Sequence, residues 1–76
     1  MATREMHPHS DEIITLMEGE LEFILNPGRN EERVRVRAGE TVIIPKGTWH
    51  CVSVIKKSVA QHILMGQGTQ VAGLEA

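Results

Sequence analysis

The chain has 76 residues and a mass of 8.4 kDa, which allows one small domain and excludes a two-domain enzyme. Its 8 Lys and Arg against 10 Asp and Glu give a formal net charge of -2, which argues against nucleic acid or an anionic membrane as a partner. No uncharged apolar stretch approaches the roughly 18–20 residues of a membrane span, and the N-terminus lacks an apolar signal core. Cys51 is the only cysteine, which excludes an internal disulfide and a multi-cysteine zinc site. We therefore expect a cytoplasmic protein whose small size favours a homodimer.

The first half of the chain contains short apolar runs that predict strands. Residues 12–18 form a mostly apolar run that ends at Gly19, and residues 21–25 alternate between the two faces of a strand. We expect these two runs to form a hairpin that turns around Gly19. The following loop, 26–30, combines Pro with Gly and predicts a chain reversal.

Apolar and charged residues alternate most strictly in residues 33–37, where two valines face one side of the predicted strand and three arginines face the other. We interpret the arginines as a solvated face and not as a phosphate-binding stripe, because glutamates flank them. The β-branched run 41–44 stops at a proline and predicts a further strand.

Two more β-rich stretches, 51–55 and 58–65, are separated by a pair of lysines, and the tail 66–76 is weakly patterned, so we expect it to fray or to pair with a partner. No segment shows helical periodicity, and turn signals recur about every eight to twelve residues. The sequence therefore predicts an all-β sandwich or barrel.

Histidines lie where predicted turns meet strands. His7 and His9 are two residues apart, so on an extended strand their side chains leave the same face. Glu12 joins them only if the chain reverses in between: a two-residue hairpin loop pairs His9 with Glu12, and a four-residue loop pairs His7 with Glu12 and adds Glu5. The longer loop suits Pro8 better, because proline has no N–H to donate to a strand ladder.

A closed β fold would return His50 to this first hairpin. Imidazoles and a carboxylate on the inner wall of a barrel form a mixed N/O donor set for one divalent transition metal per chain, whether Fe, Mn, Ni, Cu or Zn. The candidate ligands are His7, His9, Glu12 and His50, with Glu5 as the alternative to His9.

The spacing Gly-x5-Pro-x-Gly-x2-His over residues 39–50 resembles the second motif of the cupin superfamily. The Glu12-x6-Gly19 spacing resembles the second half of that family's first motif, His-x-His-x(3,4)-Glu-x6-Gly. With four residues before Glu12, the family's two histidine positions fall on Glu5 and His7. The Asn that often closes the second motif is replaced by Val54.

The resemblance implies one domain over 1–76, with motif one at 7–19 and motif two at 39–54. It implies a small cupin-like β-barrel of the jelly-roll or double-stranded β-helix type, with a strand from a partner in a dimer as one way of completing it. It also supports His7, Glu12 and His50 as metal ligands.

Resemblance to this family implies a metal site with open positions for a small oxygen-rich substrate, in dioxygenation, decarboxylation or isomerisation chemistry. Two alternatives are a non-catalytic barrel that binds a small ligand or senses a metal, and a structural barrel without metal. Residues considered for lining the mouth are Ile14, Leu16, Ile44 and Val52.

Three other reactive or aromatic side chains receive a structural interpretation. We expect His62 to lie on an edge strand, although it could act as a base or acid beside the metal. Strand alternation sends Cys51 to the face opposite His50, where it is expected to pack as a small hydrophobe. Trp49 is expected to contribute packing near the barrel mouth or a dimer interface.

Overall fold

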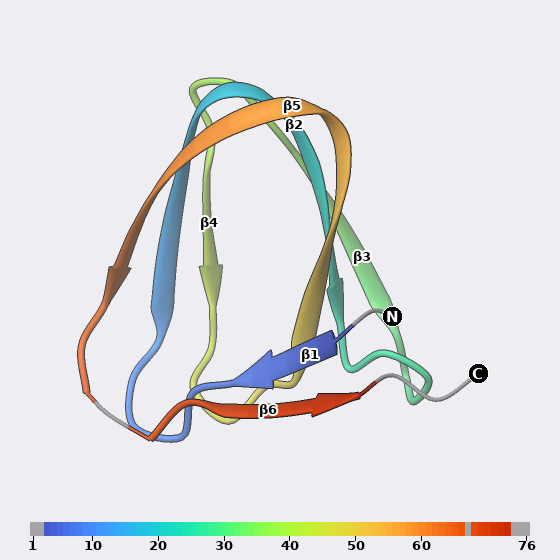
Figure 1. Ribbon diagram of the computed structural model, residues 1–76, viewed down its shortest axis with the longest axis vertical. Helices are drawn as coiled ribbons and strands as arrows, with labels where there is room; N and C mark the ends of the chain where they lie inside the picture. Colours follow the sequence, from blue (N-terminus) through green and yellow to red (C-terminus); the bar gives the residue numbers. More distant parts are fainter. Residues whose placement is uncertain (1–2, 67, 74–76) are drawn as a thin grey trace.

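The computed structural model describes residues 3–66 and 68–73 and contains six strands and no helix within these ranges (Figure 1). The prediction of an all-β protein is therefore confirmed. Within these ranges there is also no helix that is long and apolar enough to cross a membrane. The strands are β1 (Thr3–Met6), β2 (Glu12–Leu25), β3 (Glu32–Arg37), β4 (Thr41–Ile44), β5 (His50–Leu64) and β6 (Gln70–Gly73).

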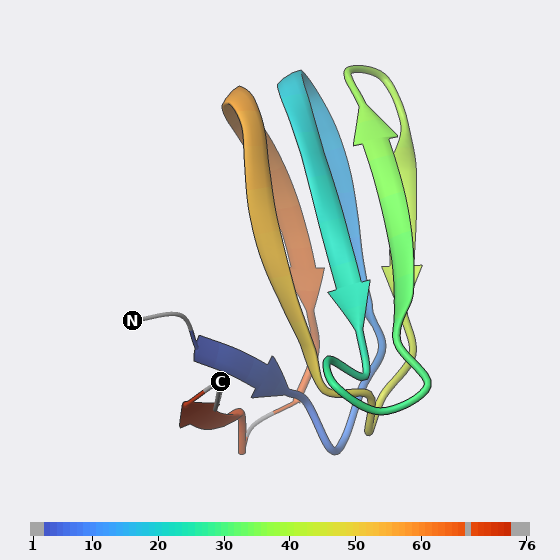
Figure 2. The same ribbon diagram turned by 90° about the vertical axis from the view of Figure 1, so that its right-hand side faces the viewer.

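The two long strands, β2 and β5, run antiparallel beside each other and arch together over the top of the molecule (Figures 1 and 2). Their register extends from Glu12 opposite Leu64 to Leu25 opposite His50. On the other edge of β2, β4 pairs with the first half and β3 with the second half. The sheet thus folds back on itself as a cupin-like barrel, although in the described chain backbone hydrogen bonds do not close it.

The bend in β2 replaces the hairpin that the sequence predicted around Gly19. Residues 12–18 and 21–25 belong to one continuous strand, and the register against β5 shifts at three points between Leu16 and Leu21. Gly19 has φ +90°, and a Cβ at this position would overlap the Lys57 carbonyl oxygen. The hairpin prediction is wrong because this glycine lets β2 bend together with β5, so β2 changes direction within one continuous strand and does not reverse.

The stretches 51–55 and 58–65 are likewise parts of one strand, β5, so the break predicted at Lys56 and Lys57 is wrong. These lysines occupy the outside of the same bend. Lysine side chains stay hydrated there, and the ladder continues past them.

The hydrophobic core lies between the two halves of the folded sheet. It consists of alternate residues from β2 together with one residue each from β3 and β4, which agrees with the alternation in the sequence. The buried members are Ile14, Leu16, Leu21, Phe23, Val36 and Ile44.

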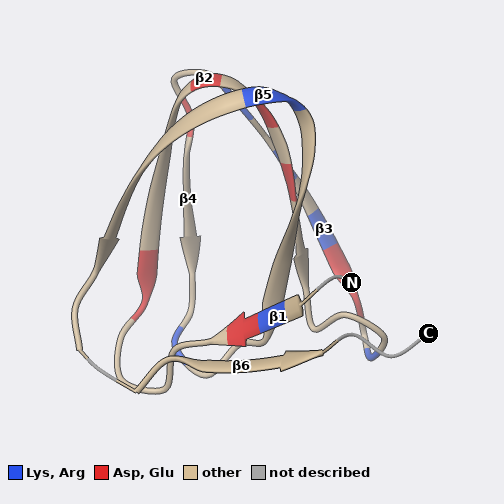
Figure 3. Cartoon of the chain, in the orientation of Figure 1, with Lys and Arg blue, Asp and Glu red and all other residues tan. Residues whose placement is uncertain are grey.

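The charged face of β3 agrees with its interpretation as a solvated surface (Figure 3). Arg33 and Arg35 are exposed and form ion pairs with Glu22 and Glu20 of β2, at 2.9 and 2.6 Å. Exposed pairs of this kind contribute little to stability, so their role is to keep this face in water.

The short strands β1 and β6 pair with each other below the open end of the arch (Figure 2). β1 touches β5 at one position, Glu5 opposite His50, and does not pair with β2. Both hairpin registers considered for residues 7–12 are therefore wrong, because β1 takes its partners from β5 and β6 instead. Part of the weakly patterned tail forms β6, whereas residues 67 and 74–76 lie outside the described residues.

Candidate metal centre

The candidate ligands come from the ends of three strands that meet at the open end of the barrel. His7 follows β1, Glu12 is the first residue of β2, and His50 is the first residue of β5. All three are buried, with 6, 8 and 6% of their surfaces exposed. A buried carboxylate and two buried imidazoles are retained in a small protein only when they satisfy one another or bind a ligand.

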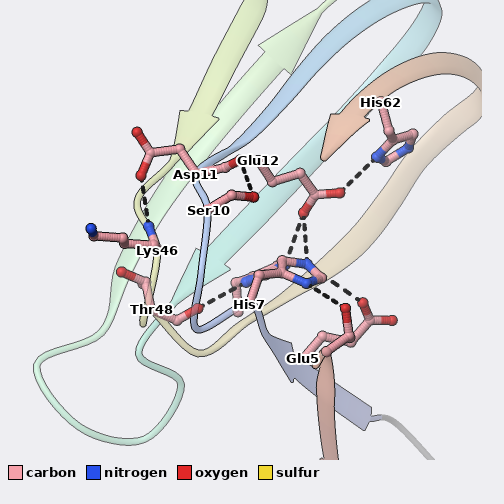
Figure 4. Close-up of polar contacts among 10 residues, drawn as sticks. Glu5, His7, Ser10, Asp11, Glu12, Lys46, Thr48 and His62 are labelled. Atoms are coloured by element: carbon pink, nitrogen blue, oxygen red, sulfur yellow. Dashed lines mark hydrogen bonds and ion pairs between the residues drawn. The ribbon is translucent and has the colours of Figure 1, made fainter. Parts of the chain in front are cut away.

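These side chains converge on one oxygen atom (Figure 4). The Nε2 atoms of His7 and His50 each lie 3.2 Å from Glu12 Oε1, and the two rings are 5.2 Å apart between centroids. Glu5 Oε2 lies 3.9 Å from His7 Nε2, and its side chain is about half exposed. Glu5, His7 and His50 offer donor atoms that all lie within 4.8 Å of one another.

The outward-facing ring nitrogens of both histidines have hydrogen-bond partners. His50 Nδ1 donates to the Thr48 carbonyl oxygen at 3.0 Å, and His7 Nδ1 shares a hydrogen bond of 2.9 Å with Thr69 Oγ1. A carbonyl oxygen only accepts, so the Nδ1 of His50 carries a proton. The charged ring also donates its Nε2–H to Glu12, and loss of that second proton leaves the Nε2 lone pair free for a metal. This arrangement is typical of histidines that bind a metal through the remaining nitrogen.

A third histidine orients the carboxylate. His62 Nδ1 donates to Glu12 Oε2 at 2.9 Å, which leaves Oε1 directed at the two buried rings. His62 lies on β5 with its side chain half exposed, as expected of a strand near an edge, and it also contacts the candidate site.

The electrostatics favour a negative carboxylate and positive charge beside it. The hydrogen bond to His50 outweighs the cost of burial and, with His62 and His7, lowers the pKa of Glu12 from 4.5 to about 2. For His50, burial opposes the charged form, but the Glu12 carboxylate and the Thr48 carbonyl raise the pKa above 6.5. The site thus stabilises a cation between the imidazoles and the carboxylate, whether that cation is a proton or a metal ion.

The donor set fits a first-row divalent metal. Two ligand atoms that each lie about 2.0–2.1 Å from one ion are roughly 2.8–3.0 Å apart at octahedral angles and roughly 3.3–3.4 Å apart at tetrahedral angles. The two nitrogen-to-oxygen distances of 3.2 Å lie between these two values. Imidazole with carboxylate is a donor set for Zn, Fe, Mn, Ni or Cu.

The structure brings together three of the four candidate ligands, His7, Glu12 and His50. It leaves His9 outside the cluster: His9 is exposed, and its ring lies near the backbone of Gly68. Glu5, the alternative to His9, has a donor atom within 4.8 Å of those of His7 and His50.

Sequence reasoning missed two residues that hold the imidazoles in place. Thr48 acts through its backbone carbonyl, for which side-chain patterns give no signal. Thr69 is 62 positions away from His7, in a tail without strong periodicity. Of the residues considered for the mouth, Ile14, Leu16 and Ile44 are buried, whereas Val52 is about half exposed.

The family model described as Cupin domain matches residues 1–66, which is most of the chain. The chain therefore belongs to the cupin family, in agreement with the resemblance of its two motifs. Comparison with curated proteins and with solved structures gives no match.

Proposed function

We propose that His7, Glu12 and His50, with Glu5 as a fourth donor, bind one divalent transition metal in each chain. The observation that carries this proposal is the convergence of two buried Nε2 atoms on one oxygen of Glu12, at 3.2 Å each. The Nδ1–H of His50 is already used by a carbonyl, so its Nε2 is available to a metal when the ring is neutral. Glu5 is favoured over His9 because Glu5 belongs to the cluster.

We further propose that the metal-loaded barrel acts on a small oxygen-rich molecule in the cytoplasm, in a dioxygenase, decarboxylase or isomerase type of reaction. A bound metal would act there as a Lewis acid or an activator of O₂. Glu12 is ionised at neutral pH, because its pKa is about 2, so it suits the role of ligand and not that of proton carrier. With Glu5 used as a ligand, the proton carrier is His62, whose side chain is about half exposed and contacts Glu12.

Metal content of purified, untagged protein tests the first proposal. We expect about one transition metal per chain by inductively coupled plasma mass spectrometry after reconstitution, and a loss of it in His50→Ala. His9→Ala is the matched control, because it removes an exposed histidine outside the cluster, and it should keep the metal. Less than a tenth of an equivalent in the unaltered protein, or equal loss in the two variants, would contradict the proposed ligand set.

Thermal unfolding with and without EDTA provides a second readout. A ligand present at roughly 100–1,000 times its dissociation constant stabilises the folded state by about 3–4 kcal/mol. For a domain of this size, each 1 kcal/mol corresponds to roughly 4–8 °C. Chelation should therefore lower the melting temperature by about 10 °C or more, whereas a structural barrel without metal would show no change.

The non-catalytic alternative is distinguished by turnover. O₂ uptake, CO₂ release and the formation of isomeric products are measured on the reconstituted protein with small hydroxy acids, phenols and sugars, with Glu5→Gln and His62→Gln as variants. Saturable binding of such a molecule without any turnover would favour the binding barrel and contradict the enzymatic proposal.

A further inference from the structure

A cleft of about 710 Å³ lies on the outer face of the folded sheet, opposite the candidate metal centre. Its floor is formed by Ile24 of β2 and Cys51 of β5, which pair with each other across the two strands. The residues that precede them, Phe23 and His50, are buried on the inner face of the sheet. Cys51 follows His50 directly, so strand alternation separates this cleft from the metal site. Arg4 of β1 and Ala72 of β6, which are also paired, form its wall.

A smaller cavity of about 270 Å³ continues from this cleft and is also lined by Arg4. Trp49 and Arg29 contribute to its wall, and Pro27 lines both cavities. We call the two cavities together the Arg4 cleft. Their combined volume is in the range that holds a small organic molecule.

The guanidinium group of Arg4 stands out among the charged groups of the cleft. In the described part of the chain Arg4 forms no ion pair, and its Nε atom is buried without a hydrogen-bond partner. By contrast, Arg33 on the rim of the cleft is paired with Glu22 and Glu31 at 2.9 Å each. Buried donors without partners are rare and costly in folded proteins, so the Nε–H of Arg4 indicates a missing acceptor beside the cleft.

The position of Arg4 is fixed by an aromatic ring. Its guanidinium carbon lies 5.0 Å from the centre of the Trp49 ring, within the range of a cation–π contact. Arg29 adds a second cation without an ion-pair partner among the described residues, and the described lining holds three arginines, Arg4, Arg29 and Arg33, against one carboxylate, that of Glu31. Ile24, Pro27 and Ala72 supply apolar surface beside these cations.

We propose that the Arg4 cleft is a second binding site, independent of the metal centre, for a small organic anion with an apolar body. The carboxylate or phosphate group of this ligand accepts hydrogen bonds from the guanidinium of Arg4, and its apolar part lies against Ile24 and Ala72. Arginine suits this role because its planar, always charged group matches both kinds of oxyanion.

Two side chains of the cleft, Trp49 and Cys51, report on ligand binding. Trp49 is the only tryptophan and lies at the cleft, so its fluorescence reports on binding. We use benzoate and phenyl phosphate as probes, inorganic phosphate as an anion without an apolar body, and benzyl alcohol as a neutral analogue. We expect saturable fluorescence changes with benzoate or phenyl phosphate at millimolar concentration or below, and the tighter of the two identifies the preferred anionic group. Inorganic phosphate and benzyl alcohol should bind at least tenfold more weakly.

Substitutions assign the effect to the cleft. Arg4→Ala should weaken binding at least tenfold, whereas Arg37→Ala, which removes an exposed arginine outside the cleft, should leave it unchanged. Ala72→Leu narrows the cleft without removing a charge and should also weaken binding, which keeps the test informative if Arg4→Ala does not fold.

The single cysteine gives a readout that does not depend on the fluorescence of Trp49. Cys51 lines the cleft, so bound phenyl phosphate or benzoate should slow its alkylation by N-ethylmaleimide, and metal loading should not remove this protection. The proposal is overturned if no probe saturates below about 10 mM, if benzyl alcohol binds as well as the anions, or if Arg4→Ala and Arg37→Ala behave alike.

Discussion

Three imidazoles contact one carboxylate, that of Glu12. This side chain begins β2, is almost fully buried, and divides its two oxygens between a pair of buried rings and one half-exposed ring. In the absence of a metal, at least one of these rings must share a proton with the carboxylate to avoid an unpaired buried charge. The pH dependence of stability should therefore depend on Glu12.

The sign of this dependence follows from the two pKa shifts. Glu12 has a lower pKa when folded, about 2 against 4.5, so it stabilises the metal-free protein fully above pH 4.5 and loses this contribution as the pH falls toward 2. A shift of this size corresponds to roughly 3 kcal/mol. The pKa of His50 is raised, so its contribution is complete below pH 6.5 and is lost as the pH rises through the raised pKa. We expect the metal-free protein to be most stable between about pH 4.5 and 6.5.

Urea unfolding of EDTA-treated protein between pH 2 and 8 measures this profile. Glu12→Gln should remove most of the loss on the acid side, with a shallower slope left by Glu20 and Glu31, whose pKa values are lowered by Arg35 and by the Gly28 N–H. Glu18→Gln, an exposed carboxylate on the same strand, is the control and should keep the wild-type profile. A profile for Glu12→Gln that parallels the wild type would show that Glu12 is not the group responsible.

Residue spacing predicted His7, Glu12 and His50 because the two motifs place chemically matched side chains at strand ends. The choice between Glu5 and His9 depends on which strand β1 pairs with, and this is a long-range property. Glu5 lies opposite His50 on β5, 45 positions along the chain, and no local pattern encodes that pairing. Local alternation therefore identified candidate donor types but did not choose between Glu5 and His9.

At the scale of the strands, the sequence correctly located the apolar runs but not their continuity. The sequence predicts a hairpin around Gly19 and a break between two strands at the lysine pair 56–57. In the structure these residues lie opposite each other, where β2 and β5 bend together. A glycine between two apolar runs permits either a reversal or a bend, and only the partner strand decides between them.

Gly19, in the bend of β2, should tolerate substitution less than Gly28, which also has a positive φ but lies in a loop. Gly19→Ala places a Cβ against the Lys57 carbonyl oxygen and retains φ +90°, so we expect a loss of about 3 kcal/mol or more in the free energy of unfolding. Gly28→Ala is the matched control, because Gly28 has φ +82° with open space around it, and it should lose only about 1–2 kcal/mol. Urea denaturation compares the two variants. Equal losses would mean that backbone conformation alone, and not the close approach of β5, requires glycine at position 19.

At the scale of the whole molecule, the barrel is open along β5. Val52 and Val54 pair with the buried residues Phe23 and Leu21, so they face the inner side of the sheet, yet 49 and 63% of their surfaces are exposed. In the described chain β5 has no further strand on this edge beyond its single pairing with β1. A free strand edge with apolar side chains on its inner face is a ready template for another strand.

We propose that a second copy of the chain covers this edge, with β5 pairing with β5 about a two-fold axis. The lysines at the bend of β5 should confine the contact to the part of the strand before them, which contains Val52 and Val54. The same edge adjoins His50, so the dimer would also shield the candidate metal centre from solvent.

Sedimentation equilibrium tests this arrangement. The protein should sediment with twice its chain mass of 8.4 kDa, and Val54→Lys should shift it to the monomer, because a charge cannot be buried in the new sheet without a partner. Ile43→Lys is the matched control: Ile43 is 58% exposed, close to the value for Val54, but lies on β4, which pairs with β2 and not with β5, so this variant should remain a dimer. A wild-type protein that is monomeric at all concentrations, or equal dissociation of the two variants, would contradict dimerisation through β5. Circular dichroism shows whether the monomeric variant is still folded, which separates loss of the interface from loss of the barrel.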